Sequence, residues 1–351
     1  MAATRDPVAD LRRIAFLLER AHSSTYRVRA FRTAANVLAG RDDLDVLAKG
    51  RGLTKLKGVG DTTAGCVLQS LAGEEPAYLR ELEAEAVSGV TESSVPAIPS
   101  LDGAGAALRA ALRGDCHTHS DWSDGGSPIE EMALTARDLG HEYLVLTDHS
   151  PRLTVANGLS AERLRRQLEV VAEINTRLAP FTILTGIEVD ILDDGALDQS
   201  EELLASLDLV VASVHSKLRM PAAEMTERML TAVANPHVDV LGHCTGRMVT
   251  GNRKRPESEF DADAVFEACV EYGVAVEVNS RPERLDPPKR LLRAAVAAGC
   301  HFSLDTDAHA PGQLDWLPYG CARAADCDVP PDRVINTRTA AQLLAHTRRH
   351  H

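Results

Sequence analysis

Apolar residues recur at helical spacing through the first part of the chain. Leu11, Ile14 and Leu18 fall three or four positions apart, and residues 28–38 repeat the pattern. Because residues three and four apart share one face of an α-helix, each run predicts an amphipathic helix. Glycines interrupt the runs where one helix would end. The pattern therefore predicts a small all-helical domain over residues 1–83.

A different pattern follows in residues 107–351. Short runs rich in β-branched and other apolar residues alternate there with helical stretches. Strands that alternate with helices are typical of α/β folds with a parallel sheet, and a barrel is one such fold. The runs expected to form strands are residues 143–147, 182–189, 209–214, 238–241, 274–278 and 302–304.

Two features mark boundaries along the chain. Residues 84–106 are rich in Ser, Gly, Ala and Pro and have little apolar periodicity, so they are expected to form a linker. Farther on, Ser127 has the position of an N-cap, Pro128 that of a first helical residue and Glu130 that of a capping-box glutamate. This second pattern predicts a helix from Pro128 and places residues 115–124 in the loop before it.

Composition limits the class of protein. The 351 residues, 44% of them hydrophobic, are enough for one large and one small domain. The chain has no run of eighteen apolar residues and its first residues are studded with charge, so neither a membrane span nor a secretory signal is expected. Seven cysteines without a C-x-x-C pair predict reduced thiols. We therefore expect a cytoplasmic protein without a membrane partner.

The first domain carries a candidate DNA-binding element. The net charge of the chain is −13, but residues 1–57 hold twelve Lys or Arg against six Asp or Glu. Gly58 and Gly60 then flank one apolar residue between two predicted helices, as in a helix-hairpin-helix. The N–H groups at such a turn can bind a DNA phosphate without reading a base. The two glycines could instead only join packed helices, but Lys55, Lys57 and the basic region favour DNA binding.

Potential metal ligands follow nearly every predicted strand. Reactive groups of α/β barrels lie in the loops after the C-terminal ends of the strands. A lone histidine there is more often an ordinary hydrogen-bonding residue, but six of the thirteen histidines have such positions. His117 and His119, two apart on an extended chain, share one face. The candidate ligands are His117, His119, Asp124, Asp148, His149, Glu188, His215, His243, Asp307 and His309.

This set of ligands indicates a class of chemistry. Imidazole nitrogens with carboxylate oxygens, and without thiolates, suit Zn²⁺, Mn²⁺ or Fe²⁺ better than Ca²⁺ or Mg²⁺. A carboxylate such as Glu188 can bridge two ions, and ions about 3.5 to 4 Å apart can activate water and hold phosphoryl oxygens. The sequence therefore predicts a metal-dependent phosphoesterase that needs no side-chain nucleophile.

Six short motifs, in order along residues 113–340, resemble the polymerase-and-histidinol-phosphatase (PHP) family. The motifs are Cys116-His117-Thr-His119-Ser, Thr147-Asp148-His149-Ser150, Gly186-Ile-Glu188-Val-Asp, Val214-His215-Ser, Leu241-Gly-His243 and Asp307-Ala-His309. The resemblance implies a distorted seven-stranded β/α (TIM-like) barrel that holds three divalent metal ions. The ligand sets that it implies are His117, His119, Glu188 and Asp307 for one ion, Glu188, His215 and His243 for a second, and Asp124, His149 and His309 for a third.

Within this family the chain is most similar to the PHP region of bacterial family X DNA polymerases. Residues 190–195, 213–216, 242–247 and 277–286 carry this likeness, and residues 31–38 and 56–60 resemble the small DNA-binding domain that opens those polymerases. The likeness implies a 3′ to 5′ exonuclease or a 3′-end processing activity on DNA.

Two departures from those polymerases limit what is expected. Only the predicted linker separates the two domains here, which leaves no room for a polymerase palm. Cys66 stands where lyase-active relatives have their Schiff-base lysine. We therefore expect neither DNA synthesis nor 5′-deoxyribose phosphate lyase activity.

Basic residues after the strands expected at residues 209–214, 238–241 and 274–278 are candidates for binding the substrate phosphate. A guanidinium can bind phosphate bidentately, although each of these residues could instead be an ordinary surface charge. They are Lys217, Arg247, Arg253, Arg255 and Arg284.

The leading function is thus a metal-dependent nuclease or DNA-end phosphoesterase. The main alternative is a small-molecule phosphatase, such as a histidinol-phosphate phosphatase, since the same kind of metal cluster can hydrolyse monoesters. A third possibility is a DNA-binding adaptor with an inactive PHP domain, which the full set of candidate ligands disfavours.

Overall fold

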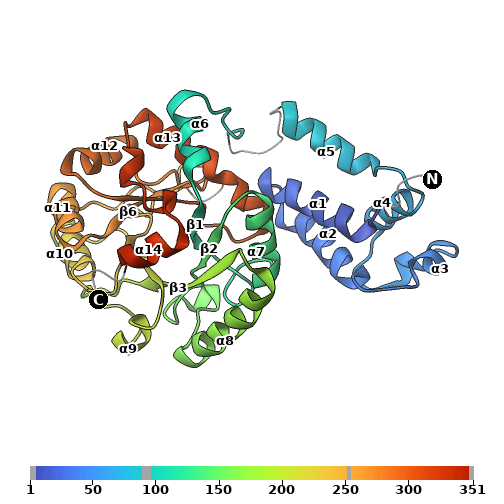
Figure 1. The fold of residues 1–351 in the computed structure, drawn as a ribbon, viewed down its shortest axis with the longest axis horizontal. Helices are drawn as coiled ribbons and strands as arrows, with labels where there is room; N and C mark the ends of the chain where they lie inside the picture. The colour runs from blue at the N-terminus through green and yellow to red at the C-terminus, as the bar shows by residue number, and fades with distance from the viewer. Residues whose placement is uncertain (1–4, 89–95, 251–253, 348–351) are drawn as a thin grey trace. The chain divides into compact units, whose positions relative to one another are not determined.

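The computed structural model describes residues 5–88, 96–250 and 254–347 (Figure 1). The chain forms two compact units, residues 1–97 and 98–351. The elements described in the first unit are all helices, as the sequence predicts. Every strand described lies in the second unit. Each unit has a hydrophobic core of its own.

The first unit is built from short amphipathic helices. The Asp6 side chain caps the first helix by accepting a hydrogen bond from the N–H of Val8 at 2.9 Å. A buried ion pair between Arg32 and Glu19, 2.7 Å apart, joins the first two helices. The helices are α1 (Pro7–Arg20), α2 (Thr25–Leu38), α3 (Leu44–Ala48), the 3-10 helix η1 (Leu53–Lys55), α4 (Asp61–Leu71) and α5 (Ala77–Ser88).

The turn between η1 and α4 has the predicted glycine pattern. Gly58 has a φ of +99°, and a β-carbon there would lie 2.7 Å from the Thr33 side chain. The position therefore requires glycine for its backbone conformation and for the space that helix α2 leaves. Gly60 is the N-cap of α4, and its N–H donates to the Thr63 hydroxyl at 3.0 Å.

The second unit is a parallel barrel of seven strands in the order of the sequence. The first and last strands meet through a parallel bridge between Thr118 and Ala308, and the N–H of His119 donates to the carbonyl of Ala308 at 2.8 Å. The barrel is therefore nearly closed. Its strands are β1 (Gly114–Thr118), β2 (Tyr143–Leu146), β3 (Thr182–Asp190), β4 (Leu209–Ser213), β5 (Val240–Leu241), β6 (Ala275–Asn279) and β7 (Phe302–Asp305).

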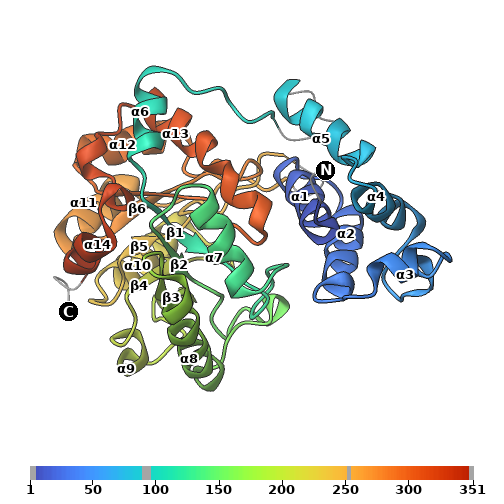
Figure 2. The same cartoon turned by 45° about the vertical axis from the view of Figure 1, so that its right-hand side comes forward.

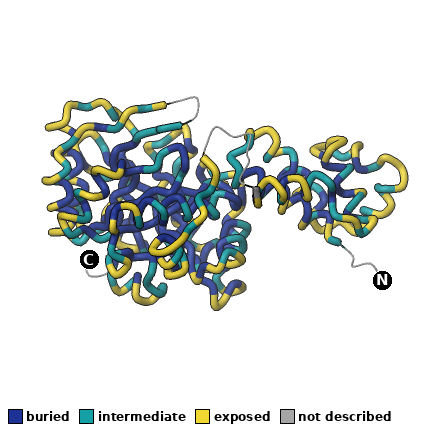
Figure 3. The backbone as a smooth tube through the Cα atoms, turned by 90° about the horizontal axis from the view of Figure 1, so that it is seen from above, coloured by how far each residue is buried: buried dark blue, intermediate teal, exposed yellow. Residues whose placement is uncertain are grey.

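Helices surround these strands, as Figure 2 shows for α7, α8, α11, α12 and α13. Figure 3 shows the same arrangement as burial, with buried backbone at the centre of this unit and exposed segments around it. The helices are α6 (Gly103–Ala111), α7 (Ile129–Asp138), α8 (Ala161–Leu178), α9 (Glu201–Leu204), α10 (Ala222–Val233), α11 (Ala262–Tyr272), α12 (Lys289–Ala298), α13 (Leu317–Asp326) and α14 (Ala340–Thr347).

All six predicted strands are confirmed, but the prediction that residues 115–124 form a loop is wrong in its first half. Residues 115–118 belong to β1, which is the one strand missing from the six predicted and has the sequence Gly-Asp-Cys-His-Thr. This strand can be buried without an apolar run because hydrogen bonds satisfy its polar groups. Asp115, for example, accepts from the N–H of His117 at 3.1 Å and from the N–H of Thr306 at 3.2 Å.

Helix boundaries also differ from the prediction in two places. Helix α7 begins one residue later than expected, because Pro128 has an extended ψ of 154° and is itself the N-cap, without a side-chain capping bond. Helix α5 continues to Ser88 and α6 begins at Gly103, so both helices extend into residues 84–106. In the described ranges no helix has both the length and the apolar character that a bilayer span requires.

Asp239, beside β5, is a buried carboxyl that weakens the barrel at high pH. Burial raises its pKa to about 7, although the N–H of Val210 donates to it at 2.8 Å. Between about pH 4 and pH 7 the folded protein keeps a proton that the unfolded chain releases. This group's contribution to stability therefore falls as the pH rises through that window.

We expect Asp239→Asn to raise the free energy of unfolding at pH 8 by on the order of 2 to 4 kcal/mol, because the amide is uncharged and its oxygen can still accept from Val210. At pH 4.5, where the wild-type carboxyl is protonated, the gain should nearly vanish. Denaturant titrations of metal-free protein at the two pH values measure the difference. Equal effects at both would contradict the assigned pKa.

Candidate metal centre

Nine of the ten predicted ligands meet at one end of the barrel. His117 and His119 lie in and after β1, and Glu188 lies in β3. The others stand in the segments that follow β1, β2, β4, β5 and β7, and the carboxyl ends of parallel strands point to the same side. The residues so brought together are His117, His119, Asp124, His149, Glu188, His215, His243, Asp307 and His309.

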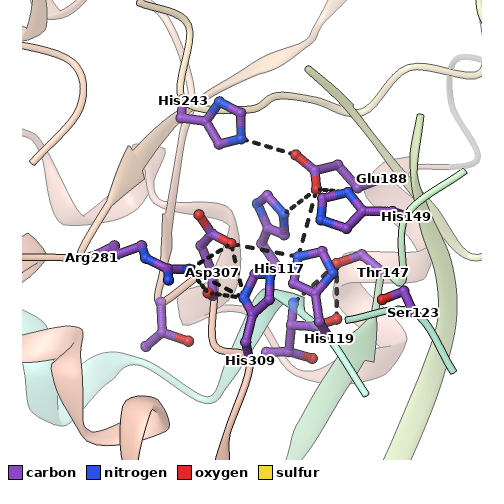
Figure 4. A network of polar contacts seen from close by, with 12 residues as sticks. His117, His119, Ser123, Thr147, His149, Glu188, His243, Arg281, Asp307 and His309 are labelled. Atoms are coloured by element: carbon purple, nitrogen blue, oxygen red, sulfur yellow. Dashed lines mark hydrogen bonds and ion pairs between the residues drawn. The ribbon is translucent and has the colours of Figure 1, made fainter. Parts of the chain in front are cut away.

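Glu188 is the centre of this cluster. Its side chain is 1% exposed, and Figure 4 shows histidines from separate strands grouped around its carboxylate. Five ring nitrogens lie within 4 Å of its two oxygens: His117 Nε2 at 3.3 Å, His119 Nε2 at 3.6 Å, His149 Nδ1 at 2.8 Å, His215 Nε2 at 3.3 Å and His243 Nε2 at 3.0 Å.

A second group forms around Asp124. Its carboxylate lies 3.3 Å from His309 Nε2 and 3.6 Å from His149 Nε2. Asp307 stands between the two groups, with one oxygen 3.5 Å from His119 Nε2. His149 contributes one ring nitrogen to each group, so the groups are continuous.

Three sets of ligand atoms are close enough to hold an ion, each within 4.8 Å of one another. Compared with the sets that the family resemblance implies, His119 joins the set around Asp124, Asp307 is absent from the set with His117, and His149 takes the place of His243. The sets are His119, Asp124, His149 and His309; His117, His119 and Glu188; and His149, Glu188 and His215.

The hydrogen bonding of these residues fits divalent metal ions. Buried ring nitrogens and one oxygen of Glu188 have no hydrogen-bond partner, although such atoms are nearly always satisfied in folded proteins. A metal ion would satisfy them, and neutral imidazole with carboxylate is a donor set for Zn²⁺, Mn²⁺ or Fe²⁺. The atoms are His117 Nε2, His119 Nδ1 and Nε2, His149 Nδ1, Glu188 Oε2, His215 Nδ1 and Nε2, and His243 Nδ1.

Electrostatics keep the central carboxylate charged. Burial alone would raise the pKa of Glu188, but the histidines around it, His117 foremost, hold that pKa well below its usual range. Burial opposes the charged form of His215, yet Glu188 and Asp190 raise the pKa of that ring to about 9. Burial, and after it the proximity of His309 and His149, hold the pKa of His119 well below its usual value. Metal binding must therefore displace protons from some rings.

Comparison with known proteins identifies the family to which the chain belongs. A family model described as a PHP domain matches residues 115–281. A protein of Thermoanaerobacter sp. (strain X514), named a probable phosphatase, is 30% identical over 234 residues, which are 64% of this chain and 89% of that protein. The chain belongs to the PHP family. With its cluster of candidate metal ligands, it is a PHP-domain phosphoesterase.

Other relatives of this PHP protein extend the comparison. A model described as a helix-hairpin-helix domain matches residues 3–75. The DNA polymerase/3′-5′ exonuclease PolX of Bacillus subtilis is 38% identical over 238 residues, and the match spans 68% of this chain but 41% of PolX. A crystal structure of histidinol phosphate phosphatase from Lactococcus lactis, complexed with Zn, L-histidinol and phosphate, has 19% identity and a TM-score of 0.44, covering 61% of this chain and 92% of that one.

Asp148 is the tenth predicted ligand, and the structure gives it another task. Its carboxylate accepts from the N–H of Ser120 at 2.8 Å, from the Ser123 hydroxyl at 2.5 Å and from Gln167 Nε2 at 2.6 Å. These contacts hold the PHP loop that carries His119 and Asp124. Asp148 was a candidate because it precedes His149, but its oxygens already accept hydrogen bonds from two segments, the loop after β1 and helix α8.

The basic residues proposed for phosphate binding divide into two kinds. Arg284 lies at the cluster, with its Nε 3.1 Å from Asp307 Oδ2. Arg247 Nε donates to the carbonyl of Arg284 at 3.1 Å, and Arg255 Nε donates to the carbonyl of Gly246 at 2.6 Å, so both brace loops. Lys217 pairs with Asp193. Arg253 lies outside the described residues.

Two residues at the PHP site were not indicated by the sequence pattern. Arg281 Nη1 donates to the carbonyl of Asp307 at 3.2 Å and lies 3.2 Å from His309 Nδ1. Glu277 Oε1 lies 2.7 Å from His117 Nδ1. A charged residue inside an otherwise apolar strand was the available signal for Glu277, since β6 is buried at all five positions.

The helix-hairpin-helix presents its predicted residues at the surface of the first unit. Lys55, Lys57, Gly58 and Gly60 are exposed, whereas Val59 between the glycines is 5% exposed and packs into the core. An exposed turn with two lysines is available to a phosphate backbone.

Proposed function

We propose that this PHP phosphoesterase hydrolyses phosphodiester bonds of DNA, as a 3′ to 5′ exonuclease or a 3′-end processing enzyme. One observation carries the proposal: the chain joins an exposed, basic helix-hairpin-helix to a barrel with a cluster of candidate metal ligands. The likeness to PolX, a named 3′-5′ exonuclease, supports it.

The nine residues at the barrel end would hold three divalent ions, of Zn, Mn or Fe, with Glu188 shared between two of them. When bound, the ions would supply activated water and positive charge for the phosphoryl oxygens. The chain itself holds Glu188 ionised and keeps His119 neutral, which are the forms that bind metals. No side chain is proposed as the nucleophile.

Arg284 is the strongest candidate for binding the substrate phosphate. Its Nε faces Asp307, while Nη1 is buried without a hydrogen-bond partner, so a phosphate oxygen could complete it. Lys217, Arg247 and Arg253 are proposed as secondary contacts. Of these, Arg247 can reach a phosphate only with its remaining N–H groups, because Nε is committed to the Arg284 carbonyl.

The first unit would bind DNA through the phosphate backbone of the nucleic acid. Gly58 and Gly60 expose the turn before α4, and Lys55 and Lys57 add positive charge beside it. Contacts of this kind are independent of base sequence and sensitive to salt.

Incubation of a 3′-labelled oligonucleotide with Mn²⁺ and the full chain tests the proposal. Wild-type protein should release labelled product, and an Asp307→Ala control should not. Metal analysis of the same samples identifies the ion. Intact substrate with both proteins would remove the nuclease proposal.

The double variant Lys55→Ala, Lys57→Ala should cut DNA less efficiently at 0.15 M salt. Each lost phosphate contact lowers the slope of log affinity against log salt by about 1, so two contacts lower it by about 2. Binding titrations at several salt concentrations measure that slope. Hydrolysis of p-nitrophenyl phosphate by the same variant should match the wild type, and an unchanged slope would exclude this turn as the DNA contact.

The second candidate is a small-molecule phosphatase. It is favoured by the relatives named phosphatases, which the matched region covers almost completely, as the 89% shared with the Thermoanaerobacter protein shows. A screen of phosphate monoesters beside oligonucleotides separates the two functions, since efficient turnover of a monoester with none of DNA would support this one. A third candidate, an inactive adaptor, would require equal turnover by the wild type and a His117→Ala, His119→Ala variant.

A further inference from the structure

Glu277 is a buried charge that the proposed mechanism does not use. It lies in β6 with an exposed fraction of 0%. It belongs to none of the three sets of atoms that could hold an ion. A carboxylate removed from water needs donors that offset the cost of burial, so its partners define its role.

Those partners are metal-ligand candidates from two other strands. One oxygen, Oε1, lies 2.7 Å from Nδ1 of His117, which comes from β1. The other, Oε2, accepts from the backbone N–H of His243, which follows β5. Oε2 also lies 3.2 Å from Nδ2 of Asn279. Both oxygens are therefore engaged by donors.

The contact with His117 determines which ring nitrogen is free. An ionised carboxylate only accepts hydrogen bonds, so Nδ1 of His117 has to carry the proton. The lone pair of the neutral ring is then on Nε2. That atom is buried, has no hydrogen-bond partner and lies 3.3 Å from Glu188 Oε2, where an ion would be held.

Glu277 also contacts two further ligand candidates, His243 directly and Asp307 through Asn279. It accepts a hydrogen bond from the backbone N–H of His243, whose ring Nε2 lies 3.0 Å from Glu188 Oε1. Asn279 Nδ2 lies 3.2 Å from Oδ2 of Asp307 as well as 3.2 Å from Glu277, so it links these two carboxylates. Glu277 thus connects ligand candidates that come from β1, β5 and β7.

We propose that Glu277 is a positioning residue of the metal centre: it fixes His117 with its proton on Nδ1 and holds the backbone of His243, so that both rings present Nε2 to the ions. The proposal rests on the proposed metal-binding function. Carboxylates that hold ligating histidines in this way tune metal affinity, and their loss typically costs about 10- to 100-fold.

Glu277→Gln tests the assignment because it keeps the shape and removes acceptors. The amide group of Gln would face a donor, either Nδ1–H of His117 or the N–H of His243. We expect Zn²⁺ and Mn²⁺ affinity to fall by about 10- to 100-fold in competition with a chelating dye. Against the opposing effect of burial, Glu188 and Glu277 raise the pKa of His117 well above its usual value in metal-free protein, so the tautomer is read at a pH above that pKa. There, long-range ¹H–¹⁵N spectra should show His117 leaving the Nδ1–H tautomer, with its signals assigned by their loss in His117→Gln.

Asp239→Asn is the matched control, since it removes a buried carboxylate of the same barrel that accepts from the Val210 backbone. It should leave metal affinity and the His117 tautomer unchanged. Glu277→Asp keeps the charge and should stay closer to the wild type than Glu277→Gln in both measurements, which covers the case in which the Gln variant does not fold. Unchanged affinity and tautomer in Glu277→Gln would overturn the proposal. Failure of wild-type protein to bind any divalent ion would instead remove the metal function, while the tautomer of His117 would still report on Glu277.

Discussion

Glu188→Gln is expected to lower phosphoester hydrolysis by roughly 1,000-fold or more, a loss of about 4 kcal/mol in transition-state stabilisation. The reason is the central place of this carboxylate, which faces ring nitrogens of five histidines within 4 Å. An uncharged amide cannot bridge two cations as a carboxylate does. Initial rates on the best substrate of the screen, together with the metal content of the purified variant, measure the effect.

A second measurement tests whether the loss of activity in Glu188→Gln has the proposed cause. The charge of Glu188 raises the pKa of His215, so the pKa of that ring should fall in metal-free Glu188→Gln. Histidine titration by NMR reports the change. Asp239→Asn, which neutralises a carboxyl away from the cluster, should keep wild-type activity and metal content. Activity of Glu188→Gln within threefold of the wild type would exclude Glu188 as a bridging ligand.

Removal of the metal ions is expected to abolish activity and to destabilise the barrel. A ligand present at 1,000 times its Kd adds about 4 kcal/mol to the stability of the folded state, which for a domain of this size raises the Tm by roughly 10 °C. Thermal melts with excess Mn²⁺ and with chelator measure the shift. Activity should return when Zn²⁺, Mn²⁺ or Fe²⁺ is added back, and the most effective ion identifies the preferred metal.

The pH dependence of this shift follows from the histidines. Because Glu188 and Asp190 raise the pKa of His215 to about 9, this ring is protonated in metal-free protein at neutral pH and must lose its proton to bind an ion. The metal-induced rise in Tm should therefore be larger at pH 8 than at pH 6. An equal rise at both values, or a larger one at pH 6, would show that no protonated ring takes part.

The strands were predictable wherever they owe their burial to apolar side chains. β2 is Tyr-Leu-Val-Leu and β4 begins Leu-Val-Val, and such runs mark buried strands without knowledge of the fold. β1 offers no such run. Its burial depends on hydrogen bonds to Thr147 and Asp305, which are distant in sequence, so only the metal-ligand spacing of His117 and His119 pointed to an extended chain there.

The same distinction explains the site. The candidate ligands were predictable because parallel strands bring their carboxyl ends together, so position in sequence gives position in space. The hydrogen bonds of Asp148 and Arg247 could not be predicted in this way, because their partners, Gln167 and the carbonyl of Arg284 among them, come from other segments. The role of Glu277 also depends on contacts across strands, and sequence spacing does not encode them.

The polar character of β1 has a consequence for how the barrel is completed. β1 lies between β7 and β2, and its side chains offer little hydrophobic driving force for joining the two. The segment that closes the ring is thus also the one that supplies His117 and His119. Ions held by these two histidines would therefore also tie β1 to Glu188 of β3 and to Asp307 after β7, and so would stabilise the closed ring as well as serve the chemistry.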